Sequence, residues 1–268
     1  MTIRVVNGRN WYGNADDDLL LLDPRMLSRA RIDLGAGSDT LAITGAGDFQ
    51  FSQNSYSSMS GVDVLDFSRL GPGTLAVNLN NTLVDQSDNN VLTVVSGVNG
   101  IDSLRASNIT VGQVVVDGVG QVNLANGVNN VVSIAGGAAL SVIGGTGNDT
   151  ITAAQAGSVL QGGLGNDVLN ARAGVDNVAY ASGDGADTVI GFNVGSDAIA
   201  LNGFSFTSLN EILALTTDTV SGALVNFANG QSLLFSGLTR ADLALATVTN
   251  NGTVLELLPP TIQVNIGT

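Results

Sequence analysis

The sequence predicts an all-β fold, a right-handed parallel β-roll or β-solenoid that ends in a short C-terminal cap of one helix and a hairpin. Short apolar runs rich in Val, Ile, Leu and Thr alternate with turns of Gly, Asn, Asp and Ser, as stacked strands require. The 35 glycines leave little room for long helices. A nine-residue phrase also occurs twice, at 144–152 and 162–170, and each copy is expected to form a turn and a short strand.

Both nonapeptides fit the pattern G-G-x-G-x-D-x-U-x, in which U is a large aliphatic residue. The glycines permit a tight left-handed turn, and the aliphatic residues, Ile151 and Leu169, are expected to point into the core. Because two nonapeptides complete one coil, residues eighteen apart should stack. Asp149 is therefore expected to lie beside Asp167, on one edge of the roll.

These stacked turns offer the ligands that calcium prefers, because calcium binds about six to eight oxygens from carboxylates and backbone carbonyls. The alternative is an ordinary Gly-Asn-Asp turn without a metal. Two copies in register favour calcium. The predicted ligands are the side chains of Asp149 and Asp167 and the carbonyls of Gly145, Gly147, Gly163 and Gly165.

The two neighbouring nonapeptides depart from the pattern. In residues 153–161 Ser158 occupies the ligand position, so this turn is expected to lack a carboxylate. Residues 171–179 retain Gly174 and Asp176 without the paired glycines. Gly174 and Asp176 remain candidate calcium ligands.

The nonapeptides resemble the hemolysin-type calcium-binding repeats of the RTX family. Residues 183–201 look like the family's closing segment, and residues 30–80 resemble it loosely. The resemblance implies a calcium-binding protein secreted by a Gram-negative bacterium through type I secretion, which reads an uncleaved C-terminal signal. Residues 1–10 lack the basic and apolar pattern of a leader peptide, as this route leads us to expect.

Residues 1–125 are expected to form a degenerate solenoid region. The run from Gly35 to Leu41 repeats the core of the motif and makes Asp39 a candidate ligand, with an ordinary turn as the alternative. Asp63 and the acidic run 16–18 fit solvated turns better. Each of these turns lacks a partner eighteen residues away.

Three further segments follow. Residues 126–202 are expected to form the calcium-binding roll proper, and three aspartates of its closing segment fit either ligands of a terminal ion or edge turns: Asp184, Asp187 and Asp197. Residues 203–258 are expected to form the cap, with a capping box from Ser208 to Glu211 at the start of its helix and a hairpin turn at 229–230. Pro259 and Pro260 begin a tail or linker, 259–268.

Composition excludes several classes of function. The formal net charge is -14 and all nine cations are arginines, so no basic stripe offers itself to nucleic acid. The absence of histidine excludes H-E-x-x-H zinc proteases and Ser-His-Asp hydrolases. No apolar run is long enough for a membrane span. Cysteine is absent. We expect no enzyme activity.

The sequence therefore predicts a secreted, calcium-binding structural protein of the cell surface, a surface layer or the extracellular matrix. Self-assembly or contact with a cell-surface polysaccharide would fit this role. The alternative is a non-catalytic polysaccharide-binding module, or an accessory of a carbohydrate-active enzyme. The biological partner, the oligomeric state and the number of ions remain open.

Overall fold

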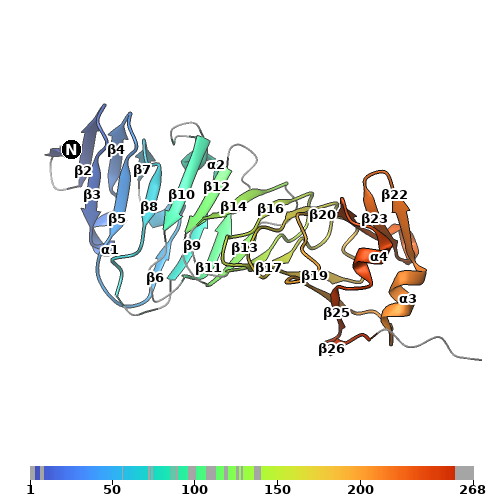
Figure 1. The fold of residues 1–268 in the computed structure, drawn as a ribbon. Helices are drawn as coiled ribbons and strands as arrows, with labels where there is room; N and C mark the ends of the chain where they lie inside the picture. The colour runs from blue at the N-terminus through green and yellow to red at the C-terminus, as the bar shows by residue number, and fades with distance from the viewer. Residues whose placement is uncertain are drawn as a thin grey trace, which may run out of the picture.

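A computed structural model of the chain describes residues 4–6, 9–55, 57–71, 73, 75–85, 87, 90–95, 101–106, 113–117, 120–124, 127, 129–135 and 140–256. Its strands succeed one another along one long axis, from β2 at the N-terminal end to a cap of short helices and hairpins at the other (Figure 1). The predicted tail, 259–268, lies outside the described residues.

Two long sheets make up most of the molecule, and from β8 to β21 successive strands alternate between them. Within the described residues the first sheet has twelve strands, in the order β22 (Thr216–Thr219), β23 (Gly222–Asn226), β24 (Ser232–Ser236), β20 (Ala186–Ile190), β18 (Val168–Asn170), β16 (Thr150–Thr152), β14 (Val131–Ala135), β12 (Gln113–Asp117), β10 (Val91–Val95), β8 (Val64–Asp66), β5 (Thr40–Ile43) and β3 (Leu19–Leu22). The second has ten, in the order β26 (Thr253–Val254), β25 (Thr247–Asn250), β21 (Ala198–Asn202), β19 (Asn177–Ala181), β17 (Ser158–Gln161), β15 (Leu140–Ile143), β13 (Gly120–Leu124), β11 (Ile101–Ala106), β9 (Leu75–Leu79) and β6 (Phe49–Phe51). From β3 to β20 and from β6 to β21 all pairings are parallel, which confirms the predicted all-β fold with parallel strands.

The N-terminal end carries a third sheet of four strands among the described residues: β1 (Arg4–Val6), β2 (Asn10–Asn14), β4 (Arg31–Gly35) and β7 (Ser58–Ser60). Helical segments are short: α1 (Pro24–Leu27), α2 (Asn81–Asp85), α3 (Leu209–Ala214), α4 (Arg240–Leu243) and the 3-10 turns η1 (Gln53–Ser55) and η3 (Ala228–Gly230). In the part of the chain that the structure describes, no helix is long and apolar enough to cross a membrane.

The predicted eighteen-residue spacing is confirmed in the nonapeptide region. Ile151 of β16 pairs with Leu169 of β18, and Leu160 of β17 pairs with Val178 of β19. All four side chains are at most 1% exposed. Because alternate residues of a strand face opposite sides, each pair of successive strands adds apolar side chains to a continuous core between the sheets.

Spacing in the first part of the chain is longer. Leu41 of β5 pairs with Leu65 of β8, twenty-four residues on, because the chain makes additional strands there in the third sheet. The pairing of β12 with β14 carries the same sheet across the predicted boundary near residue 125.

The C-terminal cap contains the predicted helix and hairpin. The helix α3 follows Ser208, but the Ser208 side chain makes no capping hydrogen bond. Glu211 instead accepts bonds from the Thr207 hydroxyl at 2.8 Å and the Thr207 backbone N–H at 3.1 Å, so the predicted capping box is wrong. The hairpin of β23 and β24 is antiparallel and closes over η3.

Candidate functional site

Three buried aspartates, which we name the first row, lie one coil apart at the starts of β16, β18 and β20. Each accepts a backbone N–H from the preceding coil through Oδ1: Asn130 donates to Asp149 at 2.7 Å, Asp149 to Asp167 at 2.7 Å and Asp167 to Asp187 at 3.0 Å. Their exposure is 2% or less. The predicted juxtaposition of Asp149 and Asp167 is therefore present, and Asp187 extends it by one coil.

The second carboxylate oxygen of each first-row aspartate is Oδ2. Within the described residues, Oδ2 of Asp149, Asp167 and Asp187 has no hydrogen-bond partner, although each is buried. An unpartnered buried carboxylate oxygen is costly.

Two glycines make room for these oxygens. A Cβ atom added to Gly162 would lie 2.1 Å from Oδ2 of Asp167. One added to Gly144 would lie 2.6 Å from Oδ2 of Asp149 and 2.1 Å from the Gly162 carbonyl oxygen. At both glycines a carboxylate oxygen lies where a side chain would begin, and at Gly144 the Gly162 carbonyl oxygen lies there as well.

The remaining glycines of the motif shape the turn. Gly145, Gly147, Gly163 and Gly165 have φ of 96°, 132°, 91° and 144°, in the left-handed region that favours glycine. The Gly145 carbonyl accepts the Leu164 N–H at 2.8 Å and so joins adjacent turns. A carbonyl has two lone pairs, so this bond does not prevent it from ligating a cation.

A second row, formed by Ser158, Asp176 and Asp197, lies at the starts of β17, β19 and β21 in the other sheet. Ser158 donates its N–H to Asp176 at 2.7 Å, and Asp176 donates to Asp197 at 3.0 Å. Here Oδ2 is also satisfied, by the N–H of Arg172 at 2.9 Å for Asp176 and of Asn193 at 2.8 Å for Asp197. Gly174, next to this row, packs against Gly157, whose nitrogen would lie 2.0 Å from an added Cβ.

The residue four positions before each aspartate explains the difference between the rows. In the second row this residue is Arg172 or Asn193, and its N–H points at Oδ2. In the first row it is Gly145, Gly163 or Gly183, with φ of 96°, 91° and 113°. We infer that the left-handed glycine turns its N–H away and leaves Oδ2 without a donor.

Asp39 belongs to a third row, with Asp18 and Asp63, at the starts of β3, β5 and β8. The Asp18 N–H donates to Asp39 at 2.7 Å, and the Asp39 N–H donates to Asp63 at 2.7 Å. Asp39 therefore has stacked carboxylate neighbours at spacings of 21 and 24 residues. A search for partners at eighteen residues misses them.

Burial raises the pKa of the first-row carboxyls. The pKa of Asp167 rises to about 6 and that of Asp187 to about 8, chiefly because desolvation penalises the charged form, with repulsion from the neighbouring carboxylates adding to it. The pKa of Asp149 is raised by the same desolvation. Without a cation, desolvation makes the charged form of these carboxyls costly.

The metal-free protein is therefore expected to lose stability between about pH 5 and pH 8. A pKa raised in the folded state means that protonation stabilises folding; this contribution is complete below the unfolded pKa near 3.8 and is lost as pH rises through about 6 and about 8. The chain has no histidine to obscure this window. Melting temperatures in chelator at both pH values measure the effect, and Asp187→Asn should reduce it. A melting temperature that increases towards pH 8 contradicts this assignment.

Among the described residues no three acidic side chains converge on one point. A cation in the first row would therefore draw part of its coordination from backbone carbonyls, as calcium does.

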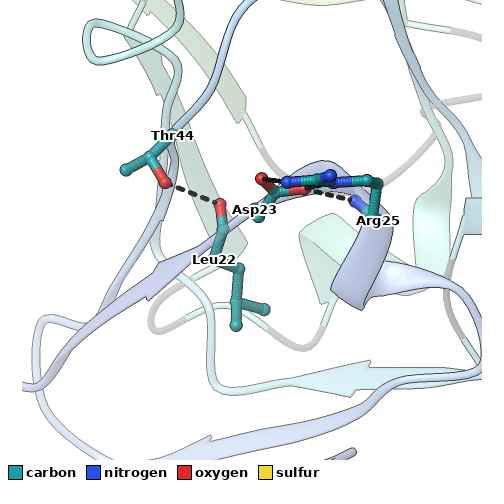
Figure 2. Close-up of polar contacts among 4 residues, drawn as sticks. All are labelled: Leu22, Asp23, Arg25 and Thr44. Atoms are coloured by element: carbon teal, nitrogen blue, oxygen red, sulfur yellow. Dashed lines mark hydrogen bonds and ion pairs between the residues drawn. The ribbon is translucent and has the colours of Figure 1, made fainter.

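A separate open groove of about 450 Å³ lies beside α1, lined by Asp23, Pro24, Arg25, Gly45, Ala46, Gly47, Asp48 and Phe49. Figure 2 shows the Arg25 side chain bonded to both carboxylate oxygens of Asp23, at 2.8 and 2.7 Å, with the Thr44 hydroxyl donating to the Leu22 carbonyl nearby. The bonds from Arg25 lower the pKa of Asp23 to about 2. The groove thus presents a fixed charge pair next to a partly buried phenyl ring.

Comparison with known proteins gives no match to this chain, either among protein-family models or among curated proteins.

Proposed function

We propose that this chain is a calcium-binding structural protein in which the first row holds the ions. The supporting observation is that Oδ2 of buried Asp149 and Asp167 has no partner among the described residues, while each carboxylate packs against a glycine, Gly144 or Gly162, whose missing side chain admits it. A buried carboxylate is retained in proteins when it is paired or coordinates a metal.

The donor set fits calcium. It consists of carboxylate and carbonyl oxygens, which hard cations prefer, and the chain has neither cysteine nor histidine to attract zinc or copper. The residues that would hold the ion are Asp149 and Asp167, with carbonyls from the glycines at 145, 147, 163 and 165. The bound ion would neutralise carboxylates whose charged form desolvation makes costly.

For the fold we propose the right-handed parallel β-roll of RTX-type proteins. Strand alternation between two parallel sheets and the eighteen-residue pairing of β16 with β18 support it. Each coil is then a repeat that contacts only its neighbours.

The proposed role is that of an extracellular scaffold at the cell surface, exported from a Gram-negative cell. Extracellular calcium sites have dissociation constants of roughly 0.1 to 1 mM, so calcium would complete the roll only outside the cell. The acidic, lysine-free composition supports a surface that depends on divalent cations.

Calcium removal is expected to loosen residues 140–200 without unfolding the first part of the chain. With free calcium ten times the dissociation constant, each site contributes about 1.4 kcal/mol, or a melting-temperature shift of about 3 to 6 °C. Hydrogen exchange with calcium and with chelator measures this region directly, and magnesium at equal concentration is the control. Equal protection of residues 140–200 in both conditions contradicts the calcium assignment.

The groove beside α1 favours a second candidate function, polysaccharide binding. Its volume suits a small ligand, and sugar hydroxyls can donate to Asp23 and accept from Arg25. Retention of the parent on a neutral or acidic polysaccharide column, together with loss of retention by Arg25→Ala, supports this candidate over the scaffold.

A further inference from the structure

Strand β3 forms the N-terminal edge of the twelve-stranded sheet, and all four of its residues are leucines. Among the described residues it pairs with β5 alone, and it lies at the opposite end of the stack from the cap (Figure 1). Edge strands are usually protected by a charge or a proline, because an unprotected edge can pair with another chain. β3 contains neither.

The hydrogen bonds to the adjacent coil show which backbone groups of β3 lie on its outer edge. The carbonyls of Asp18 and Leu22 each accept an N–H from that coil at 2.8 Å. Since the peptide groups of a strand alternate in direction, the N–H and C=O groups of Leu19 and Leu21 point away from β5. In the described part of the chain, these four groups have no hydrogen-bond partner.

Leu21 also exposes its side chain at this edge. Leu20 and Leu22 face the core and are 3% and 2% exposed, whereas Leu21 on the outer face is 50% exposed. An added strand would cover Leu21 and supply partners for the outward backbone groups. The edge of β3 therefore has the features of a site for strand addition.

The other edges of the two long sheets are better protected. At the N-terminal end η1 packs against β6, and the Ser55 hydroxyl donates to the Gln50 carbonyl at 3.2 Å. In the cap α4 lies against β22, and β26 has only two residues. Of these four edges, β3 is the one best suited to accept a strand.

The chain also contains a strand-like sequence at 261–266, outside the described residues. Apolar and polar residues alternate there, in the order Thr-Ile-Gln-Val-Asn-Ile, which is the period of a β-strand. Residues 257–268 have no charged side chain. Antiparallel pairing of two β3 strands, in contrast, would bring the flanking aspartates of one copy, 16–18 and 23, close to those of the other. The uncharged segment is thus the more favourable partner for β3.

This segment can reach β3 only in another copy of the chain. Eight strand-to-strand steps separate β20 from β3, which is about 38 Å at the usual strand spacing. Glu256 lies beyond β20, in the cap, where its carbonyl accepts the Leu209 N–H at 3.0 Å. The four residues 257–260 span at most about 14 Å, so pairing with β3 of the same copy is excluded.

We propose that residues 261–266 of one copy add as a strand to the outer edge of β3 in a second copy, so that copies join head to tail. A contact between two different surfaces of this kind generates a chain of copies or a closed ring. The inference names a second copy as the partner of the proposed scaffold and rests on that role. It does not depend on calcium binding.

Two substitutions separate the accepting edge from the donated strand. Leu21→Pro removes an N–H that points away from β5, so the bonds between β3 and β5 remain. Val264→Asp places a charge in the middle of the donated segment. Each is expected to weaken association by about tenfold or more, because each removes one half of the same contact.

A lysine pair provides the matched control. Leu21→Lys adds a charge at the open edge and should weaken association as Leu21→Pro does. Val159→Lys adds the same charge to β17, which is paired on both sides. Val159 is 41% exposed, close to the value for Leu21. This variant should associate like the parent.

Sedimentation velocity of the full chain in calcium chloride, over a range of concentrations, measures the association. The parent should form a series of oligomers that grows with concentration, while Leu21→Pro and Val264→Asp alone should each remain monomers. An equimolar mixture of these two variants should form dimers and no larger species, because it combines one functional segment with one functional edge.

A parent that stays monomeric at all concentrations overturns the inference, and so does a Leu21→Pro variant that associates like the parent. A dimer that persists in Val264→Asp would indicate pairing of β3 with β3 and would also overturn it. If circular dichroism shows that Leu21→Pro does not fold, Leu21→Lys takes its place, and unchanged association there is decisive against the inference.

Calorimetry with calcium chloride on the same samples separates this inference from the calcium function. A parent that binds calcium but remains monomeric contradicts strand addition alone. A parent that forms the oligomer series without binding calcium contradicts the calcium function alone.

Discussion

Asp167→Asn is expected to lower the calcium affinity of the chain at least tenfold and, in chelator, to make the chain more stable than the parent. The affinity falls because Asp167 is the central carboxylate of the first row and contributes an unpartnered oxygen to the proposed site. The stability rises because a pKa of about 6 means that the parent must keep a desolvated carboxylate charged at pH 7 and above. We expect a gain of about 1 to 3 kcal/mol in chelator at pH 8.

An asparagine side chain is compatible with the hydrogen bonds of the first row. Asn130 already lies at the end of it and donates to Asp149 through both its backbone and its side chain, each at 2.7 Å. Chemical denaturation with calcium and with chelator measures both expected changes: the smaller stabilisation by calcium and the higher stability in chelator. The control is Asp176→Asn, whose carboxylate oxygens both accept backbone N–H groups, so an amide nitrogen would face one of these donors; it should gain less stability in chelator than Asp167→Asn and leave calcium affinity unchanged. A variant of Asp167 that is less stable than the parent in chelator would show that its carboxylate is structural.

Gly162→Ala is expected to cost about 3 kcal/mol of unfolding free energy, at the upper end of what overpacking a tight site costs. The added Cβ would lie 2.1 Å from Oδ2 of Asp167 and 2.6 Å from its Cγ, so the whole carboxylate must move. The φ of Gly162 lies outside the left-handed region, so the cost is one of space and not of backbone conformation.

Gly195→Ala is the matched control, because its Cβ would meet only the Asn193 side chain, at 3.4 Å, also without a left-handed φ. We expect a change within about 0.5 kcal/mol there. Denaturant titration in saturating calcium measures both variants. Similar stability of the two alanine variants would mean that Asp167 does not occupy the space in front of Gly162, and the proposed ligand geometry would be wrong.

The sequence allowed good prediction where the repeat is regular. The eighteen-residue spacing predicted that Ile151 would pair with Leu169 and that Asp149 would lie next to Asp167, since a regular coil length determines which residues stack. The hairpin turn at 229–230 was equally predictable, because Asn229 adopts the left-handed conformation that Asn-Gly turns favour.

Irregular coils were less predictable. The partners of Asp39 lie 21 and 24 residues away because the first coils include a third sheet, and no motif marks that insertion. Asp187 was left open because its coil is two residues longer than the regular one. At Ser208 the predicted capping box is absent, because Glu211 accepts hydrogen bonds from the hydroxyl and backbone N–H of Thr207 instead.

The glycine four residues before an aspartate has an evolutionary consequence. A change from Arg172 to glycine would remove the side chain from a position whose N–H now closes the turn on Asp176, while leaving both sheets and the core residues as they are. The reverse change at Gly163 would require the backbone to leave its φ of 91°, because an added Cβ would lie 2.2 Å from the Gly145 carbonyl oxygen. If the first row binds calcium as we propose, a single substitution at this position would change the number of bound ions and leave the architecture that carries them as it is.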